Sequence, residues 1–204
     1  MACRRWPAAR MRENHMNANN QPTPDLSRFD DRSFNRGVGR FREALWLLVR
    51  QALFPNGFLR CYRLKSAVLR AFGASVGRGV VIKPGVRVSF PWRLKIGNHV
   101  WIGEEANILS LADVTIGNDV VISQRAFLCT GSHDWSDPAF ALITRPITIE
   151  DGAWIAADVF VAPGVTVGKQ AVATAGSVVT HDLPPEMICS GNPCVPVKER
   201  RFRD

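Results

Sequence analysis

From Val76 onward, a large aliphatic side chain returns every six residues over most of the chain. The step of six recurs within five trios of positions, and fourteen of these fifteen positions hold Ile, Val or Leu. An α-helix repeats after about 3.6 residues and a strand after about two, so neither element alone explains the spacing. The positions are Val76, Ile82, Val88, Ile96, Ile102, Ile108, Ile116, Ile122, Leu128, Ile149, Ile155, Val161, Val167, Ala173 and Val179.

A six-residue period predicts a chain that coils through three short flat sides, with about eighteen residues per circuit. One aliphatic side chain on each side points inward, and successive circuits stack these side chains into a continuous core. Four positions after most of the aliphatic residues the chain holds Val, Ala or Ser, which fit where it bends. The pairs Gly97–Asn98 and Gly117–Asn118 favour tight turns. Five circuits exceed the roughly three repeats that such arrays need.

A long excursion interrupts this repeat between Leu128 and Ile149. It contains the stretch "TGSHDWSDPAF", Thr130 to Phe140, and we expect it to form an extruded loop over residues 130–147. Loops held by a rigid scaffold often carry function. His133 is the candidate general base in this loop, because a neutral imidazole can accept a proton from a hydroxyl near pH 7.

The segment before the repeat is basic. Residues 1–80 hold fifteen Lys and Arg against five Asp and Glu, a net charge of +10, whereas residues 81–204 have a net charge of −2. Residues 1–40 are expected to be a flexible basic tail, and two helices are expected within residues 41–75. The first carries an apolar stripe of Phe41, Ala44, Leu45, Leu48, Ala52 and Leu53, and the second one of Cys61, Leu64, Val68 and Phe72. Either stripe packs on the repeat region or lies on a membrane surface.

Composition excludes several classes of protein. The five cysteines are odd in number and form no CxxC pair, which argues against a disulfide framework or a zinc knuckle and favours a reducing, cytoplasmic setting. No apolar run approaches the roughly 20 residues of a membrane span. The arginines of the basic segment are scattered and lack a nucleic-acid-binding motif, so no nucleic acid is expected as a partner.

Several strings in the chain resemble one family closely. "DLSRFD", "VVIKPGV", "PWRLKIG", "TGSHDWSDPAF", "IEDGAWIAADV" and "GNP" look like the hexapeptide-repeat acyltransferases, and most like WcaF-type acetyltransferases of colanic acid and exopolysaccharide biosynthesis. The resemblance runs from about Val76 to Arg200. It implies a mainly β fold, a left-handed parallel β-helix of about five coils over residues 76–183, followed by a C-terminal extension over 184–204.

The resemblance also implies site residues. The family's base falls on His133, and Asn107 matches a position that lines the acceptor pocket, although Asn107 is equally explained as a turn residue. Asp134 and Trp135 are expected beside the acceptor. Asp134, Asp137 or a backbone carbonyl is expected to orient the imidazole.

The coenzyme A groove is inferred from the same resemblance. Small residues allow a pantetheine arm to lie along the coil, and a lysine can pair with phosphate. Ordinary coil geometry explains the small residues as well, and His181 stands where the family usually has lysine. The expected cofactor-binding residues are Trp154, Ala157, Ala175, Gly176, Thr180, His181 and Lys198.

Two other chemistries are not expected. Zinc, as in carbonic anhydrases with the same coil, needs three converging histidines, and His99, His133 and His181 lie far apart in the repeat. Cys129 follows the inward Leu128 directly, so it is expected to be a coil residue rather than a nucleophile.

The family therefore implies an acetyl-CoA-dependent O-acetyltransferase without a metal, assembled as a homotrimer with active sites between subunits. The expected acceptor is a sugar hydroxyl of an exopolysaccharide or lipid-linked glycan precursor, with the protein cytoplasmic and in peripheral contact with the inner membrane. Two alternatives remain open. One is an acyltransferase for another small acceptor, such as serine, an amino sugar or an antibiotic, and the other is a non-catalytic β-helix assembly module.

Overall fold

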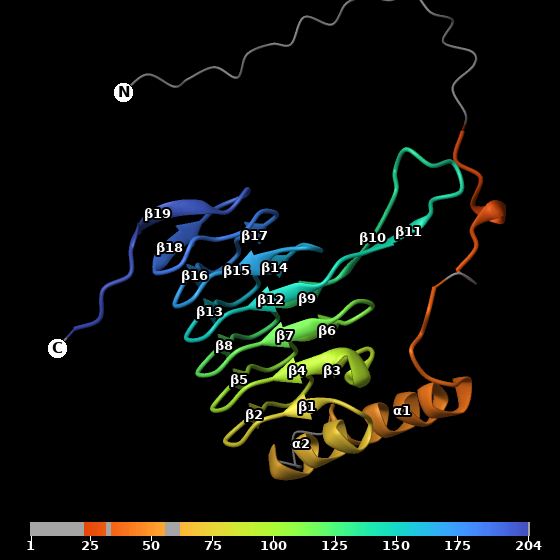
Figure 1. Ribbon diagram of the computed structural model, residues 1–204, viewed down its shortest axis with the longest axis horizontal. Coiled ribbons are helices and arrows are strands. Elements are labelled where there is room, and N and C mark those ends of the chain that lie inside the picture. Colours follow the sequence, from red (N-terminus) through yellow and green to blue (C-terminus); the bar gives the residue numbers. More distant parts are fainter. Residues whose placement is uncertain (1–22, 32–33, 56–61, 204) are drawn as a thin grey trace, which may run out of the picture.

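The computed structural model describes residues 23–31, 34–55 and 62–203. Short strands of three sheets, parallel except for the antiparallel pair β18 and β19, stack into a triangular coil, with two helices at one end and a hairpin that leaves the coil (Figure 1). The strands are β1 (Ser75–Val76), β2 (Val81–Ile82), β3 (Arg87–Val88), β4 (Leu94–Ile96), β5 (Trp101–Ile102), β6 (Asn107–Leu109), β7 (Val114–Ile116), β8 (Val121–Ile122), β9 (Phe127–Cys129), β10 (Gly131–His133), β11 (Leu142–Thr144), β12 (Ile147–Ile149), β13 (Trp154–Ile155), β14 (Phe160–Val161), β15 (Thr166–Val167), β16 (Val172–Ala173), β17 (Val178–Val179), β18 (Met187–Ser190) and β19 (Val195–Glu199).

Each complete coil adds one strand to each of the three sheets. The first sheet has the order β1-β4-β7-β12-β15, the second β19-β18-β16-β13-β8-β5-β2, and the third β17-β14-β9-β6-β3. A sixth turn begins with a bridge between Val167 and Leu183 and continues into β18. The expected fold class, a mainly β parallel β-helix with an N-terminal helical segment, is confirmed.

The predicted aliphatic positions form the core. In the second sheet, Ile102 pairs in register with Ile122, and Ile122 with Ile155, so that these side chains stack along the coil. Ile122 and Ile155 are 0% exposed. All fifteen positions of the repeat are buried, so the six-residue period marks the residues that point into the coil.

The Gly-Asn pairs work differently from the prediction. Gly97 and Gly117 are not among the residues with positive φ, which at these turns are His99 and Asp119. A Cβ added to Gly97 would lie 2.5 Å from the carbonyl oxygen of Gly117 in the next coil, so lack of space is what requires glycine. The asparagine beside each glycine links the coils, because Asn98 donates its backbone N–H to Asn118 Oδ1 at 2.9 Å.

Helices α1 (Arg40–Leu53) and α2 (Tyr62–Ala71) lie at the end of the coil that carries β1, β2 and β3 (Figure 1). Trp46 and Phe54 of the first helical segment and Leu69 of α2 join the hydrophobic core. Trp46 Nε1 donates to the carbonyl of Val88 at 3.1 Å. The buried ammonium of Lys65 donates to the carbonyls at the end of β2, so the helices close the first coil.

Most of the apolar stripe predicted for the first helix faces away from the coil, and only its last residue, Leu53, is partly buried against the core. Phe41 is 84% exposed and Leu48 71% exposed, whereas Trp46, on the opposite side of α1, is 0% exposed. The indole of Trp46 supplies the main contact between α1 and the coil, and membrane contact through the exposed part of the stripe stays a prediction. In α2 the contact comes from Lys65, Leu69 and the partly buried Val68 and Phe72, while Leu64 is exposed and Cys61 lies outside the described residues.

The excursion between β9 and β12 is an antiparallel hairpin of β10 and β11 that projects from the coil (Figure 1). Its stem is tied to the coil at Thr130, whose buried hydroxyl donates to the carbonyl of Leu109 at 2.6 Å. Two short 3₁₀ helices complete the described elements, η1 (Leu26–Arg28) and η2 (Pro91–Arg93). Near η1, the backbone N–H of Asp25 donates to the carbonyl of Pro138 at 2.8 Å, so this segment lies against the hairpin. The predicted division into segments 1–40, 41–75, 76–183 and 184–204 stays a prediction.

Candidate active site

The hairpin places His133 at the end of β10, where it pairs in register with Leu142 of β11. Its imidazole stacks on the ring of Phe140, with 4.3 Å between ring centroids and 12° between planes. The ring of Phe29 approaches from the N-terminal segment, with a centroid distance of 5.8 Å. Two aromatic neighbours therefore hold the imidazole in one orientation.

A backbone carbonyl fixes the tautomer of this histidine. His133 Nδ1 lies 2.8 Å from the carbonyl oxygen of Phe140. Because a carbonyl oxygen can only accept, we assign the ring proton to Nδ1. The lone pair of the neutral ring is then on Nε2, which is the form a general base needs.

His133 lines a cleft of about 270 Å³ between the hairpin and the coil. The indole of Trp135 is 89% exposed and forms one edge of this cleft. Polar groups of Ser132 and Arg145 line it as well. The cleft thus combines a base, an apolar surface and hydrogen-bond donors, which are the groups needed to hold a polar acceptor.

Neither candidate carboxylate touches the imidazole. Asp134 Oδ1 accepts from the hydroxyl of Ser136 at 2.5 Å and from its backbone N–H at 2.9 Å, and these hydrogen bonds lower the pKa of Asp134. Asp137 Oδ1 accepts from the backbone N–H of Ala139 at 2.9 Å. Both carboxylates stabilise the turn of the hairpin. Of the three expected ways to orient the imidazole, the structure shows the backbone carbonyl.

Asp134→Asn is therefore expected to lower kcat/KM for acetyl transfer by less than about tenfold, because an amide oxygen can still accept from Ser136. The pH at which kcat/KM is half-maximal is expected not to move, since Asp134 does not contact His133. A pH–rate profile of the variant beside the unaltered protein measures both quantities. A loss of about 10⁴-fold, as when serine proteases lose the carboxylate that orients their histidine, would assign that role to Asp134.

Cys129 is buried and does not face the cleft. Its thiol is directed at the carbonyl of Gly131 at 3.1 Å, and burial raises its pKa. Cys189 and Cys194 are also buried free thiols, and burial raises the pKa of Cys189 to about 11. A raised pKa leaves little thiolate near pH 7, so none of these three cysteines has the character of a nucleophile.

The other residues predicted for the acceptor and the nucleotide lie elsewhere on the coil. Asn107 is on β6 of the third sheet, half-buried, and does not line the His133 cleft. Trp154 is on β13 of the second sheet, where its Nε1 donates to Ser123 Oγ at 2.9 Å. The next residue on each strand, Ile108 or Ile155, is buried and points into the coil. Because side chains alternate along a strand, Asn107 and Trp154 project outward.

The small residues predicted for the pantetheine arm form part of one corner of the coil. Gly176 donates its backbone N–H to the carbonyl of Ala157 at 2.9 Å, which joins two successive turns. Ala175 and Gly176 are exposed, and no atom lies within 4 Å of a Cβ added to Gly176. This corner is therefore open to a ligand that lies along the wall.

The remaining predicted residues lie at the C-terminal end. Thr180 Oγ1 and His181 Nδ1 are 2.9 Å apart on an exposed turn. Lys198 is on β19, in a shallow cleft of about 540 Å³ that also involves Ile188, Glu199 and Arg201. Within one chain, the structure brings together His133, Asp134 and Trp135, but it does not bring Asn107 or the predicted coenzyme residues into their cleft.

Three residues around His133 were not predicted from the sequence. Phe140 and Phe29 fix the imidazole, and Arg145 lines the cleft where β11 returns to the coil. The antiparallel pairing of β10 with β11 brings the chain back to the base of the hairpin, where the backbone N–H of Arg145 donates to the carbonyl of Thr130 at 2.9 Å and the residue lines the same cleft as His133. A histidine and an aromatic residue seven positions apart around a Pro-containing turn are a weak signal for such a hairpin.

Within residues 23–31, 34–55 and 62–203, no group of three or more His, Cys, Asp or Glu side chains could hold a metal ion. No helix in that part of the chain has the length and apolar character to cross a membrane.

Comparisons with known proteins agree on one kind of chemistry. The chain is 42% identical over 176 residues to the "Putative colanic acid biosynthesis acetyltransferase WcaF" of Escherichia coli (strain K12), covering 86% of this chain and 97% of the relative. It is 31% identical over 143 residues to the galactoside O-acetyltransferase of the same organism, covering 69% and 70%. No protein-family model matches.

Solved structures share the fold and bind coenzyme A. A hexapeptide-repeat acetyltransferase of Vibrio cholerae O1 biovar eltor, complexed with acetyl-coenzyme A, superimposes with a TM-score of 0.72 at 29% identity, covering 85% of this chain and 93% of that one. A galactoside acetyltransferase in complex with coenzyme A gives a TM-score of 0.72 at 25% identity, with coverages of 85% and 86%.

Proposed function

The chain belongs to the hexapeptide-repeat acetyltransferases, and from this premise we propose that it transfers an acetyl group to a sugar hydroxyl of an exopolysaccharide precursor, with His133 as general base. The use of acetyl-CoA as co-substrate follows from the family. The observation that carries the proposal is the fixed tautomer of His133, because its Nδ1 is held by the carbonyl of Phe140 and its Nε2 keeps the lone pair.

The proposed reaction needs no covalent enzyme intermediate. His133 Nε2 takes the proton of the acceptor hydroxyl while the oxygen attacks the thioester carbonyl. The resulting oxyanion is stabilised by donors of the cleft, for which the Ser132 hydroxyl and the Arg145 guanidinium are candidates. The C–S bond then breaks, and the protonated imidazole returns its proton to the leaving thiolate. Products are an acetyl ester and free coenzyme A.

The names of the relatives support a sugar as acceptor. One relative is named for colanic acid biosynthesis and another for O-acetylation of galactosides. We propose Asn107, Asp134 and Trp135 for the acceptor side, and Trp154, Ala157, Ala175, Gly176, Thr180, His181 and Lys198 for the coenzyme side.

A homotrimer with sites between subunits would explain why these groups are separated within one chain. The His133 cleft of one subunit would then face the coenzyme groove of the next. Light scattering on the purified protein is expected to give about three times the chain mass of 22.6 kDa. A mass of one chain under assay conditions that support full activity would contradict this arrangement.

The direct test of the function is a mass spectrum of the host's surface glycan with and without the gene. The proposal expects one acetyl group to be missing from the repeating unit when the gene is deleted, and restored by the intact gene. An unchanged glycan would contradict the proposed acceptor. Acetylation of serine, an amino sugar or an antibiotic by the purified protein would then identify the alternative, and no transfer at all would favour an assembly module.

Contact with the cytoplasmic face of an anionic membrane is also proposed, through the outer face of α1. Phe41 and Leu48 are 84% and 71% exposed there, and the exposed side chains of Arg40 and Arg42 flank them. The only acidic residue of α1, Glu43, is half-buried and ion-paired with Arg36 at 2.7 Å. An apolar face with basic flanks is typical of helices that lie in a membrane interface.

The double variant Phe41→Ser/Leu48→Ser is expected to bind vesicles of phosphatidylglycerol and phosphatidylethanolamine at least about tenfold more weakly, because each buried apolar side chain contributes about 1.5–3 kcal/mol. Vesicle co-sedimentation measures this. Leu26→Ser, which changes an exposed leucine of η1, is the matched control and is expected to bind normally. If the unaltered protein remains in the supernatant and the double variant changes the oligomeric mass, the face contacts a second copy instead.

A further inference from the structure

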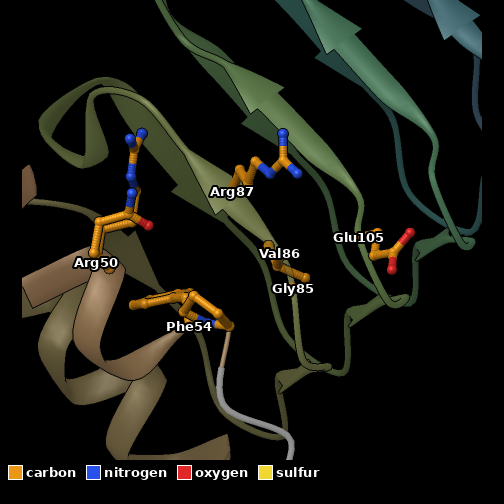
Figure 2. A pocket seen from close by; sticks show the side chains of 8 residues that line it. Arg50, Phe54, Gly85, Val86, Arg87 and Glu105 are labelled. Carbon is orange, nitrogen blue, oxygen red and sulfur yellow. The ribbon is translucent and has the colours of Figure 1, made fainter.

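Another cleft lies beside β3, between the C-terminal end of α1 and the first coil. Its volume is about 540 Å³, within the range of small-molecule sites. Figure 2 shows Arg50 rising from α1 on one side, Arg87 of β3 in the centre and Glu105 beyond it. None of these residues belongs to the site proposed above.

Neither arginine of this cleft has an acidic partner in the part of the chain that the structure describes. Among residues 23–31, 34–55 and 62–203, no ion pair involves Arg50 or Arg87. To the described residues, Arg50 makes one long hydrogen bond, from Nη1 to the carbonyl of Val88 at 3.4 Å. Most of its five donors therefore remain available to a ligand.

The arginines also act on each other. Burial, and then the positive charge of Arg87, lower the pKa of Arg50. Two like charges beside a partly buried wall raise the free energy of the empty cleft, and an anion between them removes that cost. Phe54, which is 1% exposed, supplies the wall below Arg50.

The carboxylate of Glu105 limits what can bind. It lies on the other side of Arg87 in Figure 2, and its charge acts on Arg125 of the neighbouring turn. A carboxylate at this end repels a ligand that is anionic throughout, but it accepts hydrogen bonds from hydroxyl groups. The lining therefore fits a ligand with one anionic group and several hydroxyls.

The cleft adjoins the predicted acceptor position. Arg87 of β3 pairs in parallel register with Asn107 of β6, so both side chains project from the same face of the third sheet on adjacent strands. We propose that Arg50 and Arg87 form an anion subsite that binds a phosphate or carboxylate group on a sugar acceptor. As a statement about the acceptor, this rests on the function proposed above.

Equilibrium dialysis of the full chain without acetyl-CoA, at low ionic strength, tests the subsite with glucose 1-phosphate, glucuronate and glucose as probes. At least one anionic sugar is expected to bind about tenfold or more tightly than glucose, since a hydrogen bond to a charged group is worth about one to two decades in affinity. The two anionic probes tell a phosphate from a carboxylate ligand. Equal affinity for all three sugars would overturn the proposal.

Substitutions locate the effect. Arg87→Gln is expected to abolish the preference for the anionic sugar, whereas Arg87→Lys keeps part of it because the charge remains. Arg203→Gln, which changes an exposed arginine near the C-terminus, is the matched control and is expected to change nothing. An unchanged preference in Arg87→Gln would overturn the subsite.

Acetyl transfer separates this proposal from the function on which it rests. If the protein acetylates neutral and anionic sugars with the same kcat/KM in both the unaltered protein and Arg87→Gln, the subsite is refuted and the acetyltransferase remains. If the anionic probe binds through Arg87 but no sugar is acetylated, the anion site stands and the proposed acceptor class fails.

Discussion

His133→Ala is expected to lower kcat for acetyl transfer to a sugar by about 10²–10⁴-fold, the range that general base catalysis contributes. The affinity for coenzyme A is expected to stay within about threefold, because the imidazole contacts Phe140 and Phe29 rather than the predicted coenzyme residues. Release of free coenzyme A in a thiol assay measures the rate, and calorimetry with coenzyme A measures the affinity.

A matched histidine variant separates the base from general effects of the substitution. His99 lies on a turn of the coil with φ 58°, remote in sequence from the hairpin, and asparagine tolerates such a backbone. His99→Asn is expected to keep full activity. A His133→Ala protein that transfers acetyl groups at the normal rate would refute the base, and loss of coenzyme binding together with activity would indicate a structural role instead.

Ile122→Ala is expected to lower the free energy of unfolding by about 2–5 kcal/mol, the range for removing a buried isoleucine side chain beyond its β-carbon. Ile122 is fully buried and stacks between Ile102 and Ile155, whose strands are fixed by the coils on either side. The coil cannot close around the missing atoms without breaking the register of three strands. Urea unfolding followed by circular dichroism gives the change in free energy.

The neighbouring residue supplies the control for this prediction. Val121 is on the same strand, β8, but projects outward and is only partly buried. Val121→Ala is expected to cost less than about 1 kcal/mol, because its side chain is already partly in contact with water. Equal destabilisation by both substitutions would contradict a core that lies only on the inner side of the coil.

The sequence predicted the coil because a single physical rule repeats in it. Each side of the coil must bury one aliphatic residue, so the burial of Ile96, Ile116 and Ile149 could be inferred from spacing alone. The pairing of these residues in the first sheet then follows from the stacking of successive circuits. Repetition made the signal strong enough to overcome the shortness of each strand.

The rest of the fold depends on contacts that occur only once. In α1, the exposed side that carries Phe41 and Leu48 has the more regular spacing of apolar residues. The side that packs on the coil has no such spacing, because a single residue, Trp46, supplies most of its buried contact. The closing of the first coil by the Lys65 ammonium has no sequence pattern at all. Single contacts of this kind follow from the three-dimensional arrangement and not from a period.

The candidate site was predictable only in part. His133 stood out because it interrupts a regular pattern, but the group that orients it was open between Asp134, Asp137 and a carbonyl. The structure shows the carbonyl of Phe140, which the hairpin turn brings back to within 2.8 Å of Nδ1. A backbone acceptor has no residue type, so sequence alone could not identify it.

The most direct test of the central claim, that His133 is the base beside the thioester, is a crystal structure of the assembled protein with coenzyme A. We expect His133 Nε2 within hydrogen-bonding reach, directly or through one water, of an acceptor oxygen placed beside the coenzyme sulfur in one pairing of subunits. An imidazole that points into solvent, far from every bound coenzyme in all subunit pairings, would contradict the account.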